Sequence, residues 1–242
     1  MVKQRILDSI DDFERRQAKY RPVAERLHDL YGTPHWNRNL SGMDELVSCI
    51  LSQNTNDSNR DRAFDALKAR YQTWDEVQNA PTDELIDTVR PAGLANQKGP
   101  RIQKVLERII AERGAYDIDF LADLPLDEAR AWLVDLDGVG PKTAAIVLCF
   151  AYNRPAFPVD THVHRVGQRI GFLPQGISAE KAHPVMEAIT PPEDYYAFHI
   201  QLITHGRQLC QARRPQCERC PLADYCDYYT SVFIKEQNHD GN

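Results

Sequence analysis

A lysine that follows a pair of glycines is the residue of this sequence with the clearest chemical use. Residues 136–144 read Leu-Asp-Gly-Val-Gly-Pro-Lys-Thr-Ala. Gly138 and Gly140 can adopt backbone angles that are closed to other residues, and Pro141 suits the first position of a helix. Lys142 then lies in the first helical turn, where the helix dipole disfavours a positive charge. Because a neutral amine can attack carbon and form a Schiff base, we expect Lys142 to act as a nucleophile.

The same glycine turn is typical of phosphate-binding sites. A turn that leads into a helix directs several backbone N–H groups toward one point, beside the positive end of the helix dipole. From the residues alone, two simpler interpretations stay open. The turn is only a corner between two helices, or Lys142 only contacts a phosphate.

An aspartate further along the chain, Asp160, offers a carboxylate to such a lysine. It stands in Pro-Val-Asp-Thr-His at 158–162, just before an expected helix start. Aspartate is a preferred N-cap there, because it accepts the free N–H groups of the first turn. One carboxylate oxygen can cap the helix while the other faces a reaction site, where it can take up a proton from an amine.

Four of the six cysteines lie close together near the C-terminus, in the pattern C-x6-C-x2-C-x5-C: Cys210, Cys217, Cys220 and Cys226. In a cytosolic protein such a group indicates a metal rather than disulfides. Zinc sites usually have two closely spaced cysteine pairs, and this segment has one. The spacing therefore favours an iron–sulfur cluster, with zinc as the alternative. Cys49 and Cys149 lie in apolar stretches, and we expect them to be buried packing residues.

The charge of the chain is unevenly distributed. The 242 residues carry a net charge of −6, which argues against a polyanionic partner. Residues 138–174 nevertheless carry four basic residues against one acidic residue, and residues 205–220 do the same. If these segments share a face, an acidic protein still offers a basic groove, whereas scattered surface charges are the simpler alternative.

The pattern of apolar residues predicts an all-α protein, because strand-like alternation is nearly absent. Ser41 with Asp44, and Thr73 with Glu76, resemble capping boxes at helix starts, and Gly114 suits a helix end. The N-terminal apolar residues have helical spacing rather than a signal core, and no stretch is long enough to span a membrane. We therefore expect a cytoplasmic protein. The apolar stripe at 102–110 indicates a helix that ends at Gly114, and the other expected helices cover 6–13, 43–51, 126–135, 141–152, 161–170, 179–189 and 194–209.

Together these elements resemble the endonuclease III branch of the helix-hairpin-helix DNA glycosylases, which repair oxidised pyrimidines. The motifs at 136–144, 159–162 and 210–226 match in that order, and the agreement extends over nearly the whole chain. The resemblance implies two helical domains with a DNA-binding cleft between them. One is a six-helix barrel with the helix-hairpin-helix, at 34–154. The other, at 1–33 and 155–242, holds a 4Fe–4S cluster on the four cysteines.

The resemblance also implies a bifunctional DNA glycosylase and AP lyase of base excision repair. Lys142 would attack the sugar of a flipped-out damaged nucleotide and displace the base, while Asp160 helps to deprotonate the lysine. The resulting imine then permits β-elimination at the abasic site. The expected partner is double-stranded DNA that contains damaged bases or abasic sites, and the protein is expected to be a nucleoid-associated monomer.

Further residues are expected to contact DNA on the same grounds. Gln53 would fill the gap left by the flipped nucleotide, and Leu94 would be an apolar wedge. Their simpler roles are a polar residue at a helix end and a leucine packed in a loop. Arg213 and Arg214 would contact phosphates. The whole expected set is Gln53, Leu94, Gly138, Val139, Gly140, Thr143, His162, Arg165, Arg213 and Arg214.

Some positions depart from the family pattern and leave base specificity open. Adenine-removing relatives typically lack a lysine at position 142. Asp137 replaces a common proline, His164 stands where an apolar residue is frequent, and the segment of Asn54 and Asn56 differs from the best-known members. The alternatives are an inactive relative that only binds DNA, and a thymine-mismatch glycosylase of related fold.

Overall fold

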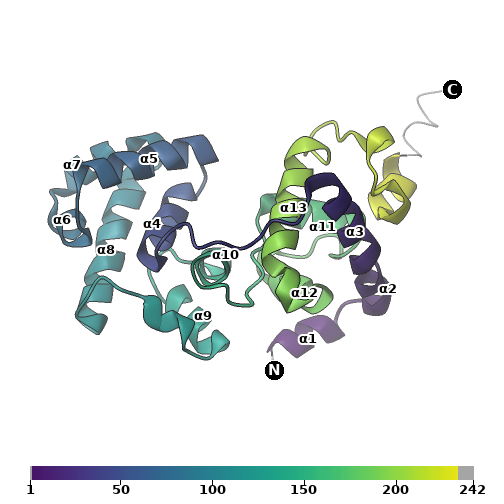
Figure 1. Ribbon diagram of the computed structural model, residues 1–242, viewed down its shortest axis with the longest axis horizontal. Coiled ribbons are helices and arrows are strands. Elements are labelled where there is room, and N and C mark those ends of the chain that lie inside the picture. The colour runs from purple at the N-terminus through teal and green to yellow at the C-terminus, as the bar shows by residue number, and fades with distance from the viewer. Residues whose placement is uncertain (1, 234–242) are drawn as a thin grey trace. The chain divides into compact units, whose positions relative to one another are not determined.

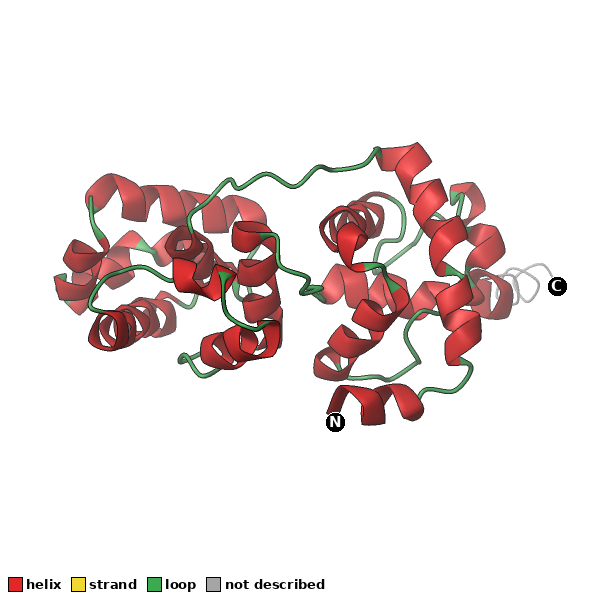
Figure 2. Ribbon diagram, turned by 60° about the horizontal axis from the view of Figure 1, so that its bottom comes forward, coloured by secondary structure: helices red, strands yellow, loops and turns green. Residues whose placement is uncertain are grey.

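The structure, a computed structural model, describes residues 2–233, and every regular element among them is a helix or a helical turn. Figure 2 shows these helices joined by loops. The all-α prediction is therefore confirmed over the described residues. The chain divides into two compact units, Asn37–Arg154 and the pair of segments Met1–Trp36 and Pro155–Asn242.

The unit of residues 37–154 is built around α4 and α8. The helix α4 is buried along most of its length and lies against α5, α8 and α10. The C-terminal end of α10 continues directly into a π-helical turn, η3 (Val147–Ala151). The helices of this unit are α4 (Gly42–Ser52), α5 (Asp57–Arg70), α6 (Trp74–Asn79), α7 (Thr82–Thr88), α8 (Ala95–Arg113), α9 (Leu126–Val134) and α10 (Pro141–Ile146) (Figure 1).

The other unit is built around α13, which packs against α11 and α3. Its core is rich in aromatic rings: Phe157 meets Tyr195 and Phe198 edge to face, with centroids 5.3 and 6.3 Å apart. The helices of this unit are α1 (Val2–Asp8), α2 (Phe13–Ala18), α3 (Tyr20–Tyr31), α11 (Thr161–Ile170), α12 (Ala179–Ile189) and α13 (Tyr195–Gln208).

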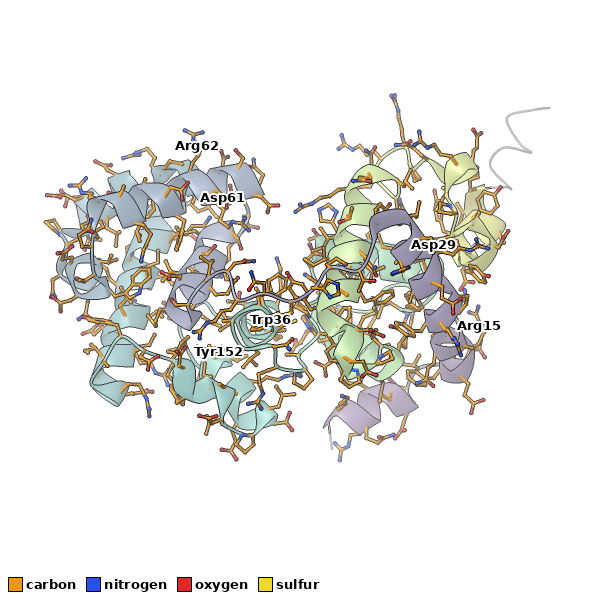
Figure 3. The ribbon with its side chains drawn as sticks, viewed as in Figure 1. Arg15, Asp29, Trp36, Asp61, Arg62 and Tyr152 are labelled. Atoms are coloured by element: carbon orange, nitrogen blue, oxygen red, sulfur yellow. The ribbon has the colours of Figure 1, made fainter. Side chains whose placement is uncertain are left out.

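Polar contacts hold the N-terminal helices of this unit to the segment after the last cysteine. Arg15, labelled in Figure 3, donates two hydrogen bonds to the carboxylate of Asp227, at 3.1 and 3.2 Å. Lys19 donates to the same carboxylate and to the carbonyl oxygens of Ile170 and Tyr225. These bonds join the segment of Arg15 and Lys19 to the chain on both sides of Cys226.

Local signals placed several helix ends correctly. Ser41 Oγ accepts a hydrogen bond from the Asp44 N–H at 3.1 Å, and Thr73 Oγ1 accepts one from the Glu76 N–H at 3.2 Å. Gly114 ends α8 in a left-handed conformation. The predicted helices 161–170 and 179–189 match α11 and α12 residue for residue.

Two predicted helices were wrong in extent, and three helices were not predicted. The N-terminal helix is broken after Asp8, because Asp12 adopts a left-handed backbone (φ 55°). The helix predicted to run to Tyr152 changes to π geometry at Val147. The helices α3, α5 and α7 were missed, and α5 buries only Ala63 and Leu67, which leaves little apolar pattern to detect. Among residues 2–233, no helix combines the length and apolar character that crossing a bilayer requires.

Candidate functional site

The turn between α9 and α10 uses its two glycines differently. Gly138 has φ 71°, and a Cβ there would lie 2.1 Å from Nε of Arg101, so any other residue here would be strained and would have to displace the Arg101 side chain. Gly140 is the extended N-cap of α10, and a Cβ there would have no neighbour within 4 Å. Val139, between them, is buried at 4% exposure. We refer to residues 137–141 as the hairpin.

Lys142 is exposed in the first turn of α10, directly after the hairpin, whereas the next residue, Thr143, is buried. Its charge acts on Cys49 of α4. Burial and the neighbouring Glu45 raise the pKa of the Cys49 thiol well above its usual value, and Lys142 opposes this rise. Cys49 and Cys149 are both buried, as predicted, at 5% and 2% exposure.

Gln53, the predicted gap-filling residue, contacts the hairpin. It is the C-cap of α4, and its Nε2 donates to the carbonyl oxygen of Gly138 at 2.9 Å. Its Oε1 accepts from Nη1 of Arg101, also at 2.9 Å. Arg101 was not predicted as a site residue, because nothing in its local sequence pattern marks it. The contact joins residues 48 positions apart, and only the fold brings them together.

Leu94, the predicted wedge, is one of the exposed large apolar residues, at 48% exposure. It is the N-cap of α8 and has a left-handed backbone (φ 49°). A left-handed backbone is strained for leucine, and strained residues cluster at ligand-binding sites. The exposed side chain of Leu94 is therefore compatible with an apolar contact to a ligand.

Asp160 is the N-cap of α11. Its Oδ1 accepts a hydrogen bond from the Val163 N–H at 2.7 Å, which confirms the capping role. Its Oδ2 has no hydrogen-bond partner among the described residues. Two residues later, burial lowers the pKa of His162. The charge of Asp160 opposes this decrease, and the charge of Arg165 adds to it.

Arg165 and Arg169 of α11 bind the chain around the first cysteine. Arg165 donates from Nη2 to the carbonyl oxygen of Gly206 at 2.8 Å and from Nε to that of Cys210 at 3.2 Å. Arg169 donates to the carbonyl oxygens of Gln211 at 2.7 Å and Ala212 at 3.1 Å. These two arginines therefore organise residues 210–226, which we call the cysteine segment. Of the first basic segment, Arg165 and Arg169 lie in this unit, and Lys142 and Arg154 lie in the other.

Arg213 and Arg214 lie in the loop that Arg169 holds, and both are exposed. Arg214 has a left-handed backbone, with φ 54°. Their guanidinium groups are accessible to a ligand, in contrast to those of Arg165 and Arg169.

One cavity is lined by all four cysteines, Cys210, Cys217, Cys220 and Cys226. Arg169 Nη1 lies 3.4 Å from Sγ of Cys210, and His205 Nε2 lies 3.6 Å from Sγ of Cys220. Burial lowers the pKa of His205 to about 4. The cysteine cavity thus provides four thiols with polar groups beside two of them.

This donor set fits an iron–sulfur cluster better than a single zinc ion. Zinc needs its ligands around one point, at about 2.3 Å for sulfur. Of the four cysteines, only Cys217 and Cys220 are closely spaced in the sequence, whereas zinc sites usually have two such pairs. In a cluster each thiolate binds a different iron, so the sulfurs stand further apart.

Comparison with known proteins decides the family. Residues 47–192 match the HhH-GPD superfamily of base excision DNA repair proteins, and residues 210–226 match the iron–sulfur binding domain of endonuclease III. Endonuclease III of Sulfolobus acidocaldarius is 34% identical over 186 residues, which cover 76% of this chain and 81% of that protein. The chain belongs to the endonuclease III family. It is a DNA glycosylase of base excision repair, and its cofactor is a 4Fe–4S cluster.

Solved structures agree with this assignment. A trapped covalent intermediate of an endonuclease III with DNA superposes with a TM-score of 0.78 at 28% identity, covering 90% of this chain and 98% of that one. A thermostable thymine-DNA glycosylase has a TM-score of 0.75 at 21% identity, covering 89% of this chain and 98% of the other. The second likeness shows a shared fold.

Proposed function

We propose that this endonuclease III relative is a bifunctional DNA glycosylase and AP lyase that removes oxidised pyrimidines from duplex DNA. The observation that carries the proposal is the exposed Lys142 in the first turn after the hairpin. A glycosylase that only hydrolyses the base needs no amine, whereas a lyase needs one to form an imine. The covalent DNA intermediate of the solved endonuclease III is consistent with such chemistry in a related protein.

In the proposed reaction, Nζ of neutral Lys142 attacks C1′ of an extruded nucleotide, and the C1′–N bond to the base breaks. The base leaves with the bonding electrons and takes up a proton. Opening of the sugar ring gives an imine between Lys142 and C1′. Loss of a C2′ proton then breaks the C3′–O bond to the phosphate, and hydrolysis of the imine releases the enzyme.

Asp160 is proposed to accept the lysine proton and to offset positive charge on the sugar. The support is that capping engages only Oδ1, while Oδ2 has no partner among residues 2–233. The cap also fixes the carboxylate against α11, so it reacts without first becoming ordered.

The four cysteines that line the cysteine cavity are the proposed cluster ligands. When bound, the cluster would cross-link the four thiolates of this segment. The segment needs such cross-links because it has few helical hydrogen bonds of its own. Arg165 and Arg169 hold the carbonyl oxygens of the same segment. Its exposed Arg213 and Arg214 are proposed to contact phosphates, together with the hairpin and His162. A single chain presents all these groups, so we propose that it acts on genomic DNA as a monomer.

Borohydride trapping tests the role of Lys142. Reduction should join the protein covalently to a duplex with one abasic site, and Lys142→Ala should abolish the crosslink. Lys104→Ala, which removes another exposed lysine of the same unit, is the matched control and should crosslink normally. Crosslinking that persists in Lys142→Ala would refute the proposal.

Paired substitutions of Asp160 separate chemistry from capping. Asparagine keeps a side-chain acceptor for the Val163 N–H but has no charge. Asp160→Asn should therefore keep the parent's free energy of unfolding and lose about 100-fold or more in the rate of base removal. Asp160→Ala should lose the same activity and about 1 kcal/mol of stability. Equal activity of Asp160→Asn and the parent would leave Asp160 as a cap only.

Duplexes with single lesions test substrate class. Those containing thymine glycol or 5-hydroxycytosine should lose the base, whereas thymine opposite guanine should remain. Preferential release of mismatched thymine would favour the alternative function instead.

A further inference from the structure

We propose that the buried Lys98 is a positioning residue that fixes the spacing between Gln53 and Leu94, the two side chains expected to enter the duplex. Its side chain joins the last turn of α4, which leads into Gln53, to the turn before α8, which carries Leu94. Lys98 would act on DNA only through these two residues. The inference rests on the proposed function, because it takes both of them to contact DNA.

Lys98 is a lysine without access to solvent. It is 1% exposed, and lysine is almost never fully buried unless it is paired. Its Nζ donates to the carbonyl oxygens of Leu51 at 2.7 Å and Ala92 at 2.8 Å. Burial lowers the pKa of Lys98, and the charge of Arg101 adds to the decrease. A neutral amine still has two N–H groups for the two oxygens, so the connection holds in either protonation state.

The first of these oxygens belongs to the last turn of α4. The final carbonyl groups of a helix have no helical N–H donor and need another partner. In the turn that follows, the Gln53 N–H donates to Ile50 and the Thr55 N–H donates to Ser52, so neither uses the oxygen of Leu51. Lys98 supplies the donor for that oxygen and thereby anchors the chain two residues before Gln53.

The second oxygen begins a strained turn. Ala92 is followed by Gly93 (φ 67°) and Leu94 (φ 49°), and a positive φ is unfavourable for leucine. Lys98 holds this turn at both ends, since its Nζ donates to Ala92 and its backbone N–H donates to the carbonyl oxygen of Leu94 at 3.0 Å. The half-exposed side chain of Leu94 is therefore presented by a backbone that is fixed before DNA binds.

The two anchored carbonyl groups have the same relation to the expected DNA contacts. Leu51 stands two residues before Gln53, and Ala92 stands two residues before Leu94. One amine thus sets the separation of both turns, and α4, α8 and the two turns belong to one compact unit. Side chains that are already ordered lose less entropy on binding. Lys98 should therefore matter most where DNA is distorted, and little where only phosphates are contacted.

DNA binding by Lys98→Met tests the proposal. Methionine keeps most of the apolar stem but has no N–H donor. Affinity for a duplex with a tetrahydrofuran abasic analogue should fall about 10-fold, because two hydrogen bonds that order the turns are lost. Affinity for the undamaged duplex should stay within about twofold, because it depends on phosphate contacts. Lys104→Met, which changes an exposed lysine of the same helix, is the matched control and should alter neither.

A fluorescent base provides a second readout. With 2-aminopurine opposite the abasic analogue, the parent should raise the fluorescence by unstacking that base, and Lys98→Met at saturating concentration should raise it less. Iron content and far-UV circular dichroism check that the variant is folded. If it does not fold, Lys98→Gln, which keeps one amide donor, replaces it and should lose about 3-fold in affinity for the analogue.

A purely structural role gives a different result. It would lower the fraction of active protein and weaken binding of both duplexes by the same factor. Such an equal loss, or unchanged binding of the analogue, would overturn the proposal. Failure of the proposed function is separate, because it would appear as absent borohydride trapping in the parent, whereas the abasic analogue reports binding alone.

Discussion

The hairpin and the cysteine segment both lie where basic residues are dense, yet they use those residues in opposite ways. The hairpin is followed by the exposed Lys142, and its backbone accepts a hydrogen bond from Gln53, which in turn accepts one from Arg101. Arg165 and Arg169 of α11 donate to carbonyl oxygens of the cysteine segment, whereas the segment's own Arg213, Arg214 and Arg219 are exposed. A count of the basic residues in 138–174 therefore overstates the basic surface of that segment, because Arg165 and Arg169 bond to backbone carbonyl oxygens.

The physical reason lies in the backbone of each region. A glycine turn between two helices satisfies most of its polar groups through caps and helical hydrogen bonds. The cysteine segment consists of short turns, so its carbonyl oxygens need donors from elsewhere. Arginine supplies several donors in a fixed geometry, which suits it to that task.

The largest effect on stability is expected when a cysteine that binds the cluster is replaced, in contrast to a cysteine that only packs in the core. Cys217→Ala should remove most of the iron and the brown colour and cost several kcal/mol of stability, because cluster binding and folding of the segment are coupled. Cys149→Ala, the matched control, should keep its iron and lose only packing energy. Iron analysis and urea unfolding measure both. Full iron content in Cys217→Ala would contradict the ligand assignment.

Glycine substitutions test how tightly the hairpin is held. Gly138→Ala should lose about 2–3 kcal/mol, because it forces a positive φ and a contact with Arg101. Gly140→Ala has an ordinary φ of −97° and open space, so it should lose under about 1 kcal/mol. Urea unfolding of both variants gives the difference. Equal costs would mean that the turn is not restrained by Arg101.

Two arginine variants sharpen the contrast within the cysteine segment. Arg169→Ala should cost about 1–2 kcal/mol of stability, since it leaves the carbonyl oxygens of Gln211 and Ala212 without their donor. Arg213→Ala should change stability by less than about 0.5 kcal/mol, but reduce the slope of DNA affinity against salt concentration by about 1. Reversed results would place Arg213 inside the fold and Arg169 on the DNA-binding surface.

The smallest effect depends on pH and concerns α4. Because burial raises the pKa of Glu45, the folded protein binds this proton more tightly than the unfolded chain. That stabilisation is present below the unfolded pKa and is lost as pH rises through the folded pKa. Glu45→Gln avoids the loss, so its stability should rise relative to the parent as pH rises from the unfolded value of about 4.3 through the folded pKa. A constant difference in urea unfolding across this range would contradict the effect.

The sequence by itself determined the features that depend on neighbours along the chain. The caps at Ser41, Thr73 and Asp160 follow from a side chain and an N–H three residues apart, so the pattern contains the whole interaction. The bounds of α11 and α12 and the spacing of the four cysteines are local in the same sense. The resemblance to the endonuclease III family rested on these local motifs.

Only the tertiary structure decided what the long polar side chains do. Arg101 and Gln53 meet across 48 positions, Arg165 reaches a carbonyl oxygen 41 positions away, and Lys98 is buried against α4. The same residue types are suited to solvent or to DNA, so their identity does not choose between these roles. The choice depends on which unsatisfied carbonyl oxygens the fold brings within reach, because an unpaired buried polar group costs more than a long side chain loses by becoming ordered.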